Sequence, residues 1–207
     1  MSTGLSTPDF VRAHFKKAIE LDPDFADPHY HLALYLKEQN RLPEAREHFS
    51  RAVEIASGCA DSLQGKANKY TAENQFEVAK HHFLKSHEQR LFSALAGYQL
   101  GLVLLDLGYP QAAEKQFTSA VELDPALTDA FYQLGRLALG RGNQQTARML
   151  FEQAVAADIR HAESHLELAN LINSEEENEL AKNHYWMAVD LEPTLLSKVL
   201  DKKFRED

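Results

Sequence analysis

The stretch YQLGLVLLDLGYPQAAEKQFTSAVELDP, residues 98–125, decides the fold. A first apolar stripe with the spacing i, i+4 and i+7 is formed by Leu100, Leu104 and Leu107. A second stripe of the same kind is formed by Ala113, Phe117 and Ala120. Such spacing predicts two amphipathic helices. Gly108 lies between them, and because glycine tolerates a left-handed backbone, we expect a tight helix–helix turn there.

This pattern recurs through the chain every 34 residues. The alanine of the second helix recurs at Ala45, Ala79, Ala113, Ala147 and Ala181. Four residues later comes an aromatic residue, at Phe49, Phe83, Phe117, Phe151 and Tyr185. A small residue of the first helix recurs at Ala33, Ala67, Gly101, Gly135 and Ala169. Self-similarity at a fixed period is typical of a repeat architecture in which each unit is one helical hairpin.

The repeated positions have physical reasons. A small residue at the helix crossing lets two helix axes approach closely, and the aromatic side chain fills the remaining space. The turn position occupied by Gly108 is taken in the other units by Asn40, Asn74, Gly142 and Glu176. Cys59, in the segment SGCAD, falls where one unit should give way to the next, so we expect it in a turn.

The pattern L-G-x-x-[LY] … A-x-x-x-F-x-x-A … D-P resembles the tetratricopeptide repeat, and the resemblance covers about residues 8–193. It implies an all-α fold, a right-handed α-solenoid of helix-turn-helix repeats. The expected segments are an N-terminal half repeat at 8–23, five tandem repeats over 26–193 that begin near 26, 60, 94, 128 and 162, and a C-terminal capping helix at 194–207. In that last helix we expect Leu196, Val199 and Leu200 to face inward. The second repeat is the poorest match, because Gly65 and Lys66 lie where a helix former and a leucine are expected.

Composition excludes several classes of protein. The chain is 44% hydrophobic and 26% charged, as in ordinary globular proteins. No apolar stretch is long enough for a membrane span, and MSTGLSTPDF does not resemble a secretory signal. A formal charge of −9 disfavours nucleic acid and anionic membranes as partners. A single cysteine cannot form a disulfide within the chain, so these features together predict a cytoplasmic protein.

No residue pattern favours catalysis, a metal or a cofactor. His161 and His165 have the i, i+4 spacing of zinc pairs, but His161 falls in a turn and His165 in an aromatic packing position. One repeat position is shared by His14, His48, His82 and His184. Neighbouring helix axes are about 8–10 Å apart, so these histidines would seldom converge on one ion, and we interpret the position as half-buried polar packing. We therefore predict a protein that is not an enzyme and needs no cofactor.

The resemblance implies a concave surface formed by the first helices. The candidate peptide-binding residues of this groove are Tyr30, His31, Asn68, Tyr98, Gln99, Leu102, Tyr132, Gln133, Arg136, Leu166 and Asn170. Tyrosine offers apolar area with a polar tip, while Asn, Gln and Arg can bond to a peptide backbone. Tyr132 and Arg136 belong to no packing column, so we expect both side chains to be available to a ligand. The Lys-Asn-Asn-Lys-Arg clamp of the chaperone-binding branch of the family is missing, which disfavours an acidic C-terminal tail as the ligand.

The leading functional prediction is a non-catalytic scaffold or adaptor that binds a peptide or helix of another protein in the groove. One alternative is self-assembly, with the N-terminal half repeat docking on a second copy. Another alternative is a regulatory module that belongs to a larger enzyme. The sequence does not identify the partner protein.

Overall fold

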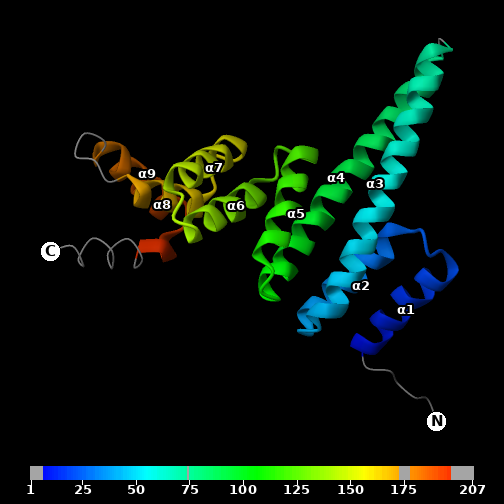
Figure 1. Ribbon diagram of the computed structural model, residues 1–207, viewed down its shortest axis with the longest axis horizontal. Coiled ribbons are helices and arrows are strands. Elements are labelled where there is room, and N and C mark those ends of the chain that lie inside the picture. The colour runs from blue at the N-terminus through cyan, green and yellow to red at the C-terminus, as the bar shows by residue number, and fades with distance from the viewer. Residues whose placement is uncertain (1–6, 74, 173–177, 197–207) are drawn as a thin grey trace. The chain divides into compact units, whose positions relative to one another are not determined.

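A computed structural model describes residues 7–73, 75–172 and 178–196 and shows an all-α protein, with no strand in these ranges (Figure 1). The helices are α1 (Thr7–Leu21), α2 (Ala26–Glu38), α3 (Leu42–Ala72), α4 (Phe76–Asp106), α5 (Pro110–Leu123), α6 (Thr128–Gly140), α7 (Gln144–Ala157), α8 (Ala162–Leu171), α9 (Asn178–Leu191) and the 3₁₀ helix η2 (Pro193–Leu195). The predicted fold class is confirmed. The chain divides into two compact units, Met1–Asp124 (unit 1) and Pro125–Asp207 (unit 2).

The turns inside the hairpins have the predicted left-handed backbone. The φ angles are 57° at Asn40, 81° at Gly108 and 74° at Gly142. Only glycine, and to a lesser degree asparagine, adopts this conformation at little cost, so these residues end one helix and start its partner. The equivalent positions Asn74 and Glu176 lie outside the described residues.

In the first, third and fourth repeats the small and aromatic columns pack as expected. Phe49, Phe117 and Phe151 are fully buried. A Cβ atom added at Gly135 would lie 2.5 Å from Cε1 of Phe151, and one added at Gly101 would also overlap the ring of Phe117. The close approach of the two helices in these hairpins therefore requires glycine.

Between hairpins, helices end where an aspartate closes the turn. The Asp22 carboxylate accepts a hydrogen bond from the backbone N–H of Asp24 at 3.1 Å, and Asp158 accepts one from the N–H of Arg160 at 2.9 Å. Such Asx turns hold the backbone in an extended conformation that stops the helix. A proline follows the acidic residue at Pro23, Pro125 and Pro193, and proline disfavours a helical conformation in the residue before it.

At two boundaries this acidic residue and proline are missing, and the helix continues. Ala56 and Ser57 stand at the first of these positions, and Arg90 and Leu91 at the second. Neither pair can close an Asx turn, so α3 and α4 each run for 31 residues across the predicted repeat boundaries near 60 and 94. The prediction that Cys59 lies in a turn is wrong: it is an exposed residue inside α3.

The two long helices form an antiparallel hairpin whose outer part, residues 58–91, projects away from the rest of unit 1 (Figure 1). We call this part the arm. The first hairpin of unit 1 then packs directly against α4 beyond the arm. The rings of Tyr30 and Phe92 are 5.3 Å apart, and the hydroxyls of Ser57 and Ser93 are 2.9 Å apart. The second predicted repeat is thus displaced outward, and the first and third are neighbours.

The two ends of the described chain differ from each other. α1 packs on α2 of the same chain, where the rings of Phe15 and His31 are stacked 5.6 Å apart. At the C-terminal end, Leu195 in η2 is buried beside Leu166, whereas Leu196 is 45% exposed. The expectation that Leu196 faces inward is wrong, because a 3₁₀ turn after Pro193 directs Leu195 to the core instead. Val199 and Leu200 lie outside the described residues.

No helix among the described residues has the length and apolar character that a membrane crossing requires.

Candidate functional site

The tyrosines of the predicted groove are more deeply packed than the sequence suggested. Tyr30 is buried and meets Phe49 edge-on at 5.7 Å. Tyr98 lies 5.8 Å from the ring of Phe117, and Tyr132 lies 5.8 Å from Phe151, both with an interplanar angle of 46°. The expectation that Tyr132 lies outside the packing columns is therefore wrong. It is half-buried because the aromatic residue of the second helix supports its ring from below.

In unit 1 the structure brings part of the candidate set together. The Lys37 ammonium on α2 donates to Oε1 of Gln99 on α4 at 3.1 Å, so these two helices lie side by side. His31 is exposed, and Leu102 is half-buried. Asn68 is on the arm, where it accepts a hydrogen bond from Nε2 of Gln64 at 3.3 Å. Displacement of the second repeat thus separates Asn68 from the candidate residues of α2 and α4.

In unit 2 the candidate residues divide between surface and core. Arg136 is exposed, with its Cζ 5.9 Å from the centroid of the Tyr132 ring, and Gln133 on the same helix is half-buried. Leu166 is buried in the cluster with Ala188, so it is a core residue and not a groove residue. Asn170 is half-buried and accepts a hydrogen bond from the Tyr185 hydroxyl at 3.0 Å.

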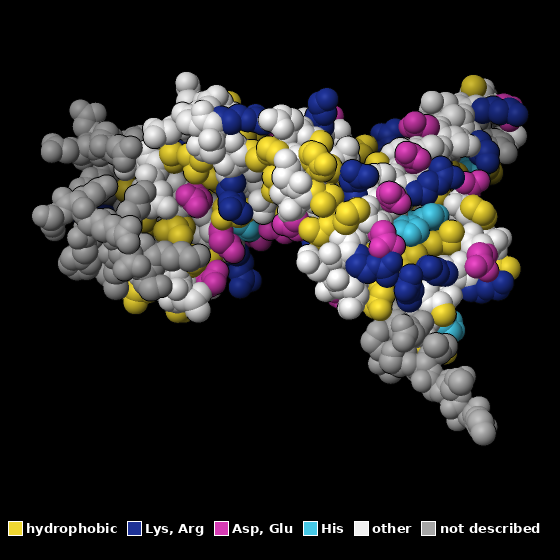
Figure 2. Space-filling model, turned by 60° about the horizontal axis from the view of Figure 1, so that its bottom comes forward, with side chains coloured by type: hydrophobic (Ala, Val, Ile, Leu, Met, Phe, Trp, Pro, Cys, Tyr) yellow, Lys and Arg dark blue, Asp and Glu magenta, His cyan; other side chains and the backbone are white. Residues whose placement is uncertain are grey.

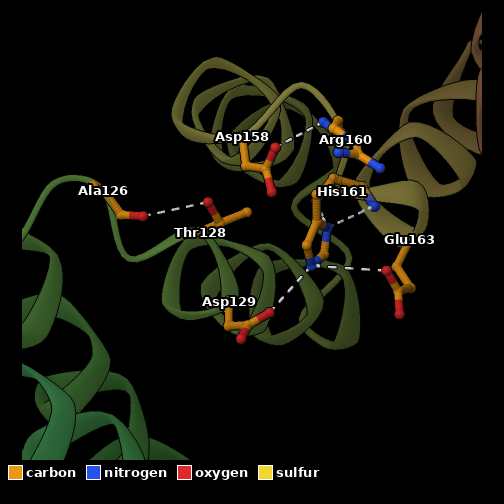
Figure 3. A network of polar contacts seen from close by, with 8 residues as sticks. Ala126, Thr128, Asp129, Asp158, Arg160, His161 and Glu163 are labelled. Carbon is orange, nitrogen blue, oxygen red and sulfur yellow. Dashed lines mark hydrogen bonds and ion pairs between the residues drawn. The ribbon is translucent and has the colours of Figure 1, made fainter. Parts of the chain in front are cut away.

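His161 is the centre of a polar network at the N-terminus of α8 (Figure 3). The backbone N–H of Ser164 donates to Nδ1 of His161 at 3.2 Å, so the histidine side chain caps the helix. Since Nδ1 accepts, the proton of the neutral ring is on Nε2, which donates to Oδ1 of Asp129 at 3.2 Å. Glu163 lies 3.8 Å from the same Nε2.

Charge around His161 changes its pKa. Burial alone would lower the pKa of His161, but the hydrogen bond to Asp129 and the nearby Glu163 raise it above the ordinary value of 6.5. In turn, the hydrogen bond from His161 lowers the pKa of Asp129. The rings of His161 and Tyr132 are 5.2 Å apart, which places this network beside the Tyr132 and Arg136 pair. The sequence analysis placed His161 in a turn but did not predict its capping role, which its position directly before α8 could have indicated.

Two of the four histidines that share one repeat position, His48 and His184, each contact a histidine 19 residues earlier in the chain. Nδ1 of His48 is 3.0 Å from Nδ1 of His29, and Nδ1 of His184 is 2.8 Å from Nδ1 of His165. Half-buried polar packing is therefore the right description of His48 and His184. The 34-residue repeat places His29 and His165 at one position and His48 and His184 at another, but the sequence did not show that these two positions face each other.

The protons of the second pair can be assigned. Nε2 of His165 donates to the carbonyl of Ile159 at 2.9 Å, so Nδ1 of neutral His165 must accept, and His184 donates from its Nδ1. In the first pair the Pro23 carbonyl raises the pKa of His29, but it does not reach hydrogen-bond geometry, and Nε2 of His29 is buried without a partner. Burial, followed by the neighbouring histidine, lowers the pKa of both His48 and His184. Each pair therefore contains at least one ring whose lowered pKa favours its neutral form.

Among the described residues, no group of three or more His, Cys, Asp and Glu side chains could hold a metal ion. The residues around Tyr132 instead combine a supported aromatic ring, an arginine over it, and carboxylates on the adjacent helix.

Comparisons with known proteins agree with the repeat pattern. Family models described as "Tetratricopeptide repeat" match residues 14–47 and 98–162. Among solved structures, the MamA RS-1 ArsTM double mutant is 17% identical, with 93% of this chain and 89% of that chain covered and a TM-score of 0.62. YrrB, described as a TPR protein with an unusual peptide-binding site, is 28% identical over 91% of this chain and 97% of its own, with a TM-score of 0.47.

PilF from Pseudomonas aeruginosa is 20% identical over 91% of this chain and 95% of its own, with a TM-score of 0.45. A search of curated proteins found no match. The two matched stretches, with the 34-residue columns and the packed small–aromatic contacts, identify this chain as a tetratricopeptide repeat protein of the α-solenoid class.

Proposed function

We propose that this chain is a non-catalytic scaffold that binds a peptide or helix of another protein on the first-helix faces, with Tyr132 and Arg136 as its main contact in unit 2. Tetratricopeptide repeats serve protein–protein interaction in general. The observation that carries the finer proposal is the exposed Arg136 guanidinium over a Tyr132 ring that Phe151 already holds in place.

A supported ring of this kind favours binding for an entropic reason. The Tyr132 side chain has little conformational freedom left to lose when a ligand packs on it, because Phe151 fixes one side of the ring. Aromatic residues and arginine are the usual energetic anchors of protein interfaces. Gln133 on the same helix offers an amide that can bond to a ligand backbone.

The electrostatics of this surface favour a ligand with charges of both signs. Burial, followed by the charge of Glu167, raises the pKa of Tyr132, which places that carboxylate near the ring. Arg136 can pair with a carboxylate or a backbone carbonyl of the ligand, while Glu163 and Glu167 can receive a basic side chain. A mixed pattern of this kind affects specificity and association rate more than affinity.

The test begins with peptides selected from a random library displayed on phage against the full chain. We expect Arg136→Ala to weaken a selected peptide by about 1–3 kcal/mol, as truncation of an anchor residue does, measured by titration calorimetry. Tyr132→Phe should keep the ring on Phe151 and lose only hydroxyl contacts, whereas Tyr132→Ala would also remove packing in the unit 2 core. Exposed Lys115 on α5 supplies the control Lys115→Ala, which should bind like wild type.

If Arg136→Ala and Tyr132→Ala both bind like wild type while remaining folded, the ligand lies elsewhere and the assignment to this face is wrong. Circular dichroism and a melting curve for each variant separate loss of binding from loss of structure.

A further inference from the structure

The arm carries an apolar face that no other described element covers. Its exposed members lie on α4, from Phe76 in the arm to Leu95 just beyond it, and their exposed fractions are 61% for Phe76, 38% for Phe83, 55% for Leu84, 36% for Leu91 and 39% for Leu95. At 3.6 residues per turn these five side chains fall within an arc of about 120° on one side of the helix. Ala79 and Ser86 are buried on another side of α4, where the Ser86 hydroxyl donates a hydrogen bond to the carbonyl of Ala60 on α3. We call the exposed side the arm face.

Phe83 shows why this face is unusual. It belongs to the aromatic column whose members Phe49, Phe117 and Phe151 are completely buried. In a regular stack the helix of the following repeat would cover such a residue. Here that following helix is the continuation of α4 itself, so it lies in line with Phe83 and cannot fold over it. Phe83 is therefore an aromatic residue at a core position of the repeat, but no following helix packs over it.

We propose that the arm face is the contact between two copies of this chain, packed as an antiparallel pair of arms. Helices of this same chain cover Phe49, Phe117 and Phe151, the fully buried members of the column. A helix of a second copy can therefore supply the cover that Phe83 lacks. A twofold contact brings the same surface of each copy together, so an apolar stripe with Phe83 and Leu84 near its middle can cover its own copy.

The exposed area agrees with a weak dimer. The five side chains expose on the order of 400 Å², which is the size of the largest apolar patch on a typical monomer, and such a patch is often functional. Two such faces bring together about 800 Å² of apolar surface, and at the roughly two-thirds apolar content of homodimer interfaces the total is about 1,200 Å². That total is at the lower limit of specific interfaces, so we expect dissociation constants in roughly the micromolar range.

Charge favours the arm over other surfaces as the place where two copies meet. The whole chain has a formal charge of −9, and two copies therefore repel each other. Residues 61–90 contain five Lys and Arg and four Asp and Glu, so the arm is close to neutral. In Figure 2 side chains of both signs are interspersed with hydrophobic ones on the projecting part of unit 1. An antiparallel pairing also leaves the two acidic unit 1 bodies at opposite ends of the paired arms.

The experiment is sedimentation equilibrium of the full chain at several concentrations, with Phe76→Glu and Leu84→Glu as separate arm variants. We expect the wild-type average mass to rise from one copy toward two with concentration, and each arm variant to stay at one copy. Leu21→Glu on α1 and Met149→Glu on α7 are matched controls, because both residues are exposed apolar side chains on other helices. Both controls should associate like wild type.

Phe76 and Leu84 are more than half exposed, so their substitution should leave the arm folded, and circular dichroism checks this. Leu84→Gln, which adds no charge, serves as a second variant should Leu84→Glu lose helix content. A wild-type chain that remains a single copy at the highest concentration overturns the proposal. So does a dimer that survives both arm substitutions, or one that the control substitutions also abolish.

Discussion

A single hydrogen atom at position 135 decides how closely α6 and α7 approach. An added Cβ would lie 2.5 Å from Cε1 of the fully buried Phe151 ring, so the ring or the helix would have to shift. We expect Gly135→Ala to destabilise the protein by about 1–3 kcal/mol, the usual cost of overpacking. Chemical denaturation followed by circular dichroism measures the change.

Gly140 on the same helix gives the matched control. An added Cβ there would meet nothing within 4 Å, so Gly140→Ala should raise stability by up to about 1 kcal/mol through helix propensity. Opposite signs for the same substitution in one helix would confirm that contact with Phe151, and not helix propensity, sets the requirement at Gly135. Two effects of equal sign would contradict it.

The histidine pairs make stability depend on pH. Burial lowers the pKa of His29, His48 and His184 below the ordinary value of 6.5, so the unfolded chain binds more protons than the folded one just below that pH. Their contribution to stability is therefore complete above 6.5 and is lost as the pH falls toward the lowered pKa values. If the accepting ring of a pair also gained a proton, both Nδ1 atoms would be N–H donors facing each other.

The fourth repeat shows how to remove this effect, because Phe131 and Leu150 occupy the same two columns there. We expect the double variant His165→Phe, His184→Leu to lose less stability than wild type when the pH falls from about 7 to about 5. Melting curves across that range measure the slope, and exposed His81→Gln is the control. An unchanged slope in the double variant would show that the His165 and His184 pair does not contribute to the pH dependence of stability.

His161 should act in the opposite direction. Although burial alone would lower its pKa, the Asp129 hydrogen bond and Glu163 raise it, so its contribution is present below the unfolded value and is lost as the pH rises through the folded one. Substitution of His161 by Asn, which can still cap α8, should therefore make the loss of stability at low pH steeper. A shallower slope in this variant would contradict the assignment.

At the scale of elements, the α3 part of the arm has little internal support. Among the residues between Gly58 and Ala72 whose burial the structure describes, the buried ones are Ala60 and Ala67, both small. Low burial and few apolar contacts favour local opening. We therefore expect backbone amides of residues 58–74 to exchange with solvent faster than those of α2 or of α4 beyond the arm, measured by hydrogen exchange and mass spectrometry.

Glycine substitutions test the arm directly. Gly65 lies inside α3 with open space around an added Cβ, so Gly65→Ala should stabilise the arm by about 1 kcal/mol and slow exchange there. Gly108 has a φ of 81°, so the same change at that turn should cost about 1–2 kcal/mol. Exchange in the arm that is unaffected by Gly65→Ala would show that opening does not involve unwinding of α3.

For the whole molecule we predict that folding needs no metal ion. A bound ion would add stability that a chelator removes. In the described part of the chain the histidines closest to forming a site, His29 with His48 and His165 with His184, bond to each other. We expect elemental analysis to find no stoichiometric metal and EDTA to leave the melting temperature unchanged. About one zinc per chain would overturn this.

Local chemistry explains why so much of the fold could be predicted. Turns at Asn40, Gly108 and Gly142 depend on the backbone freedom of one residue, and the apolar stripes depend on spacing along one helix. The predicted hairpins that have these turns are present, and the small–aromatic contacts are those expected. The candidate binding residues depended on the resemblance as well, and for Tyr132 and Leu166 the burial was misjudged.

By itself the sequence determined the helical repeat, its 34-residue period and the positions of these turns, because each depends on neighbours close in the chain. Only the tertiary structure decided that α3 and α4 continue through two repeat boundaries, that Phe83 is left partly exposed, and that His48 and His184 each meet a second histidine. The physical reason is that periodicity tells which face of a helix is apolar but not which neighbour covers it. That choice depends on whether a boundary can close a turn and on the packing of residues far apart in sequence.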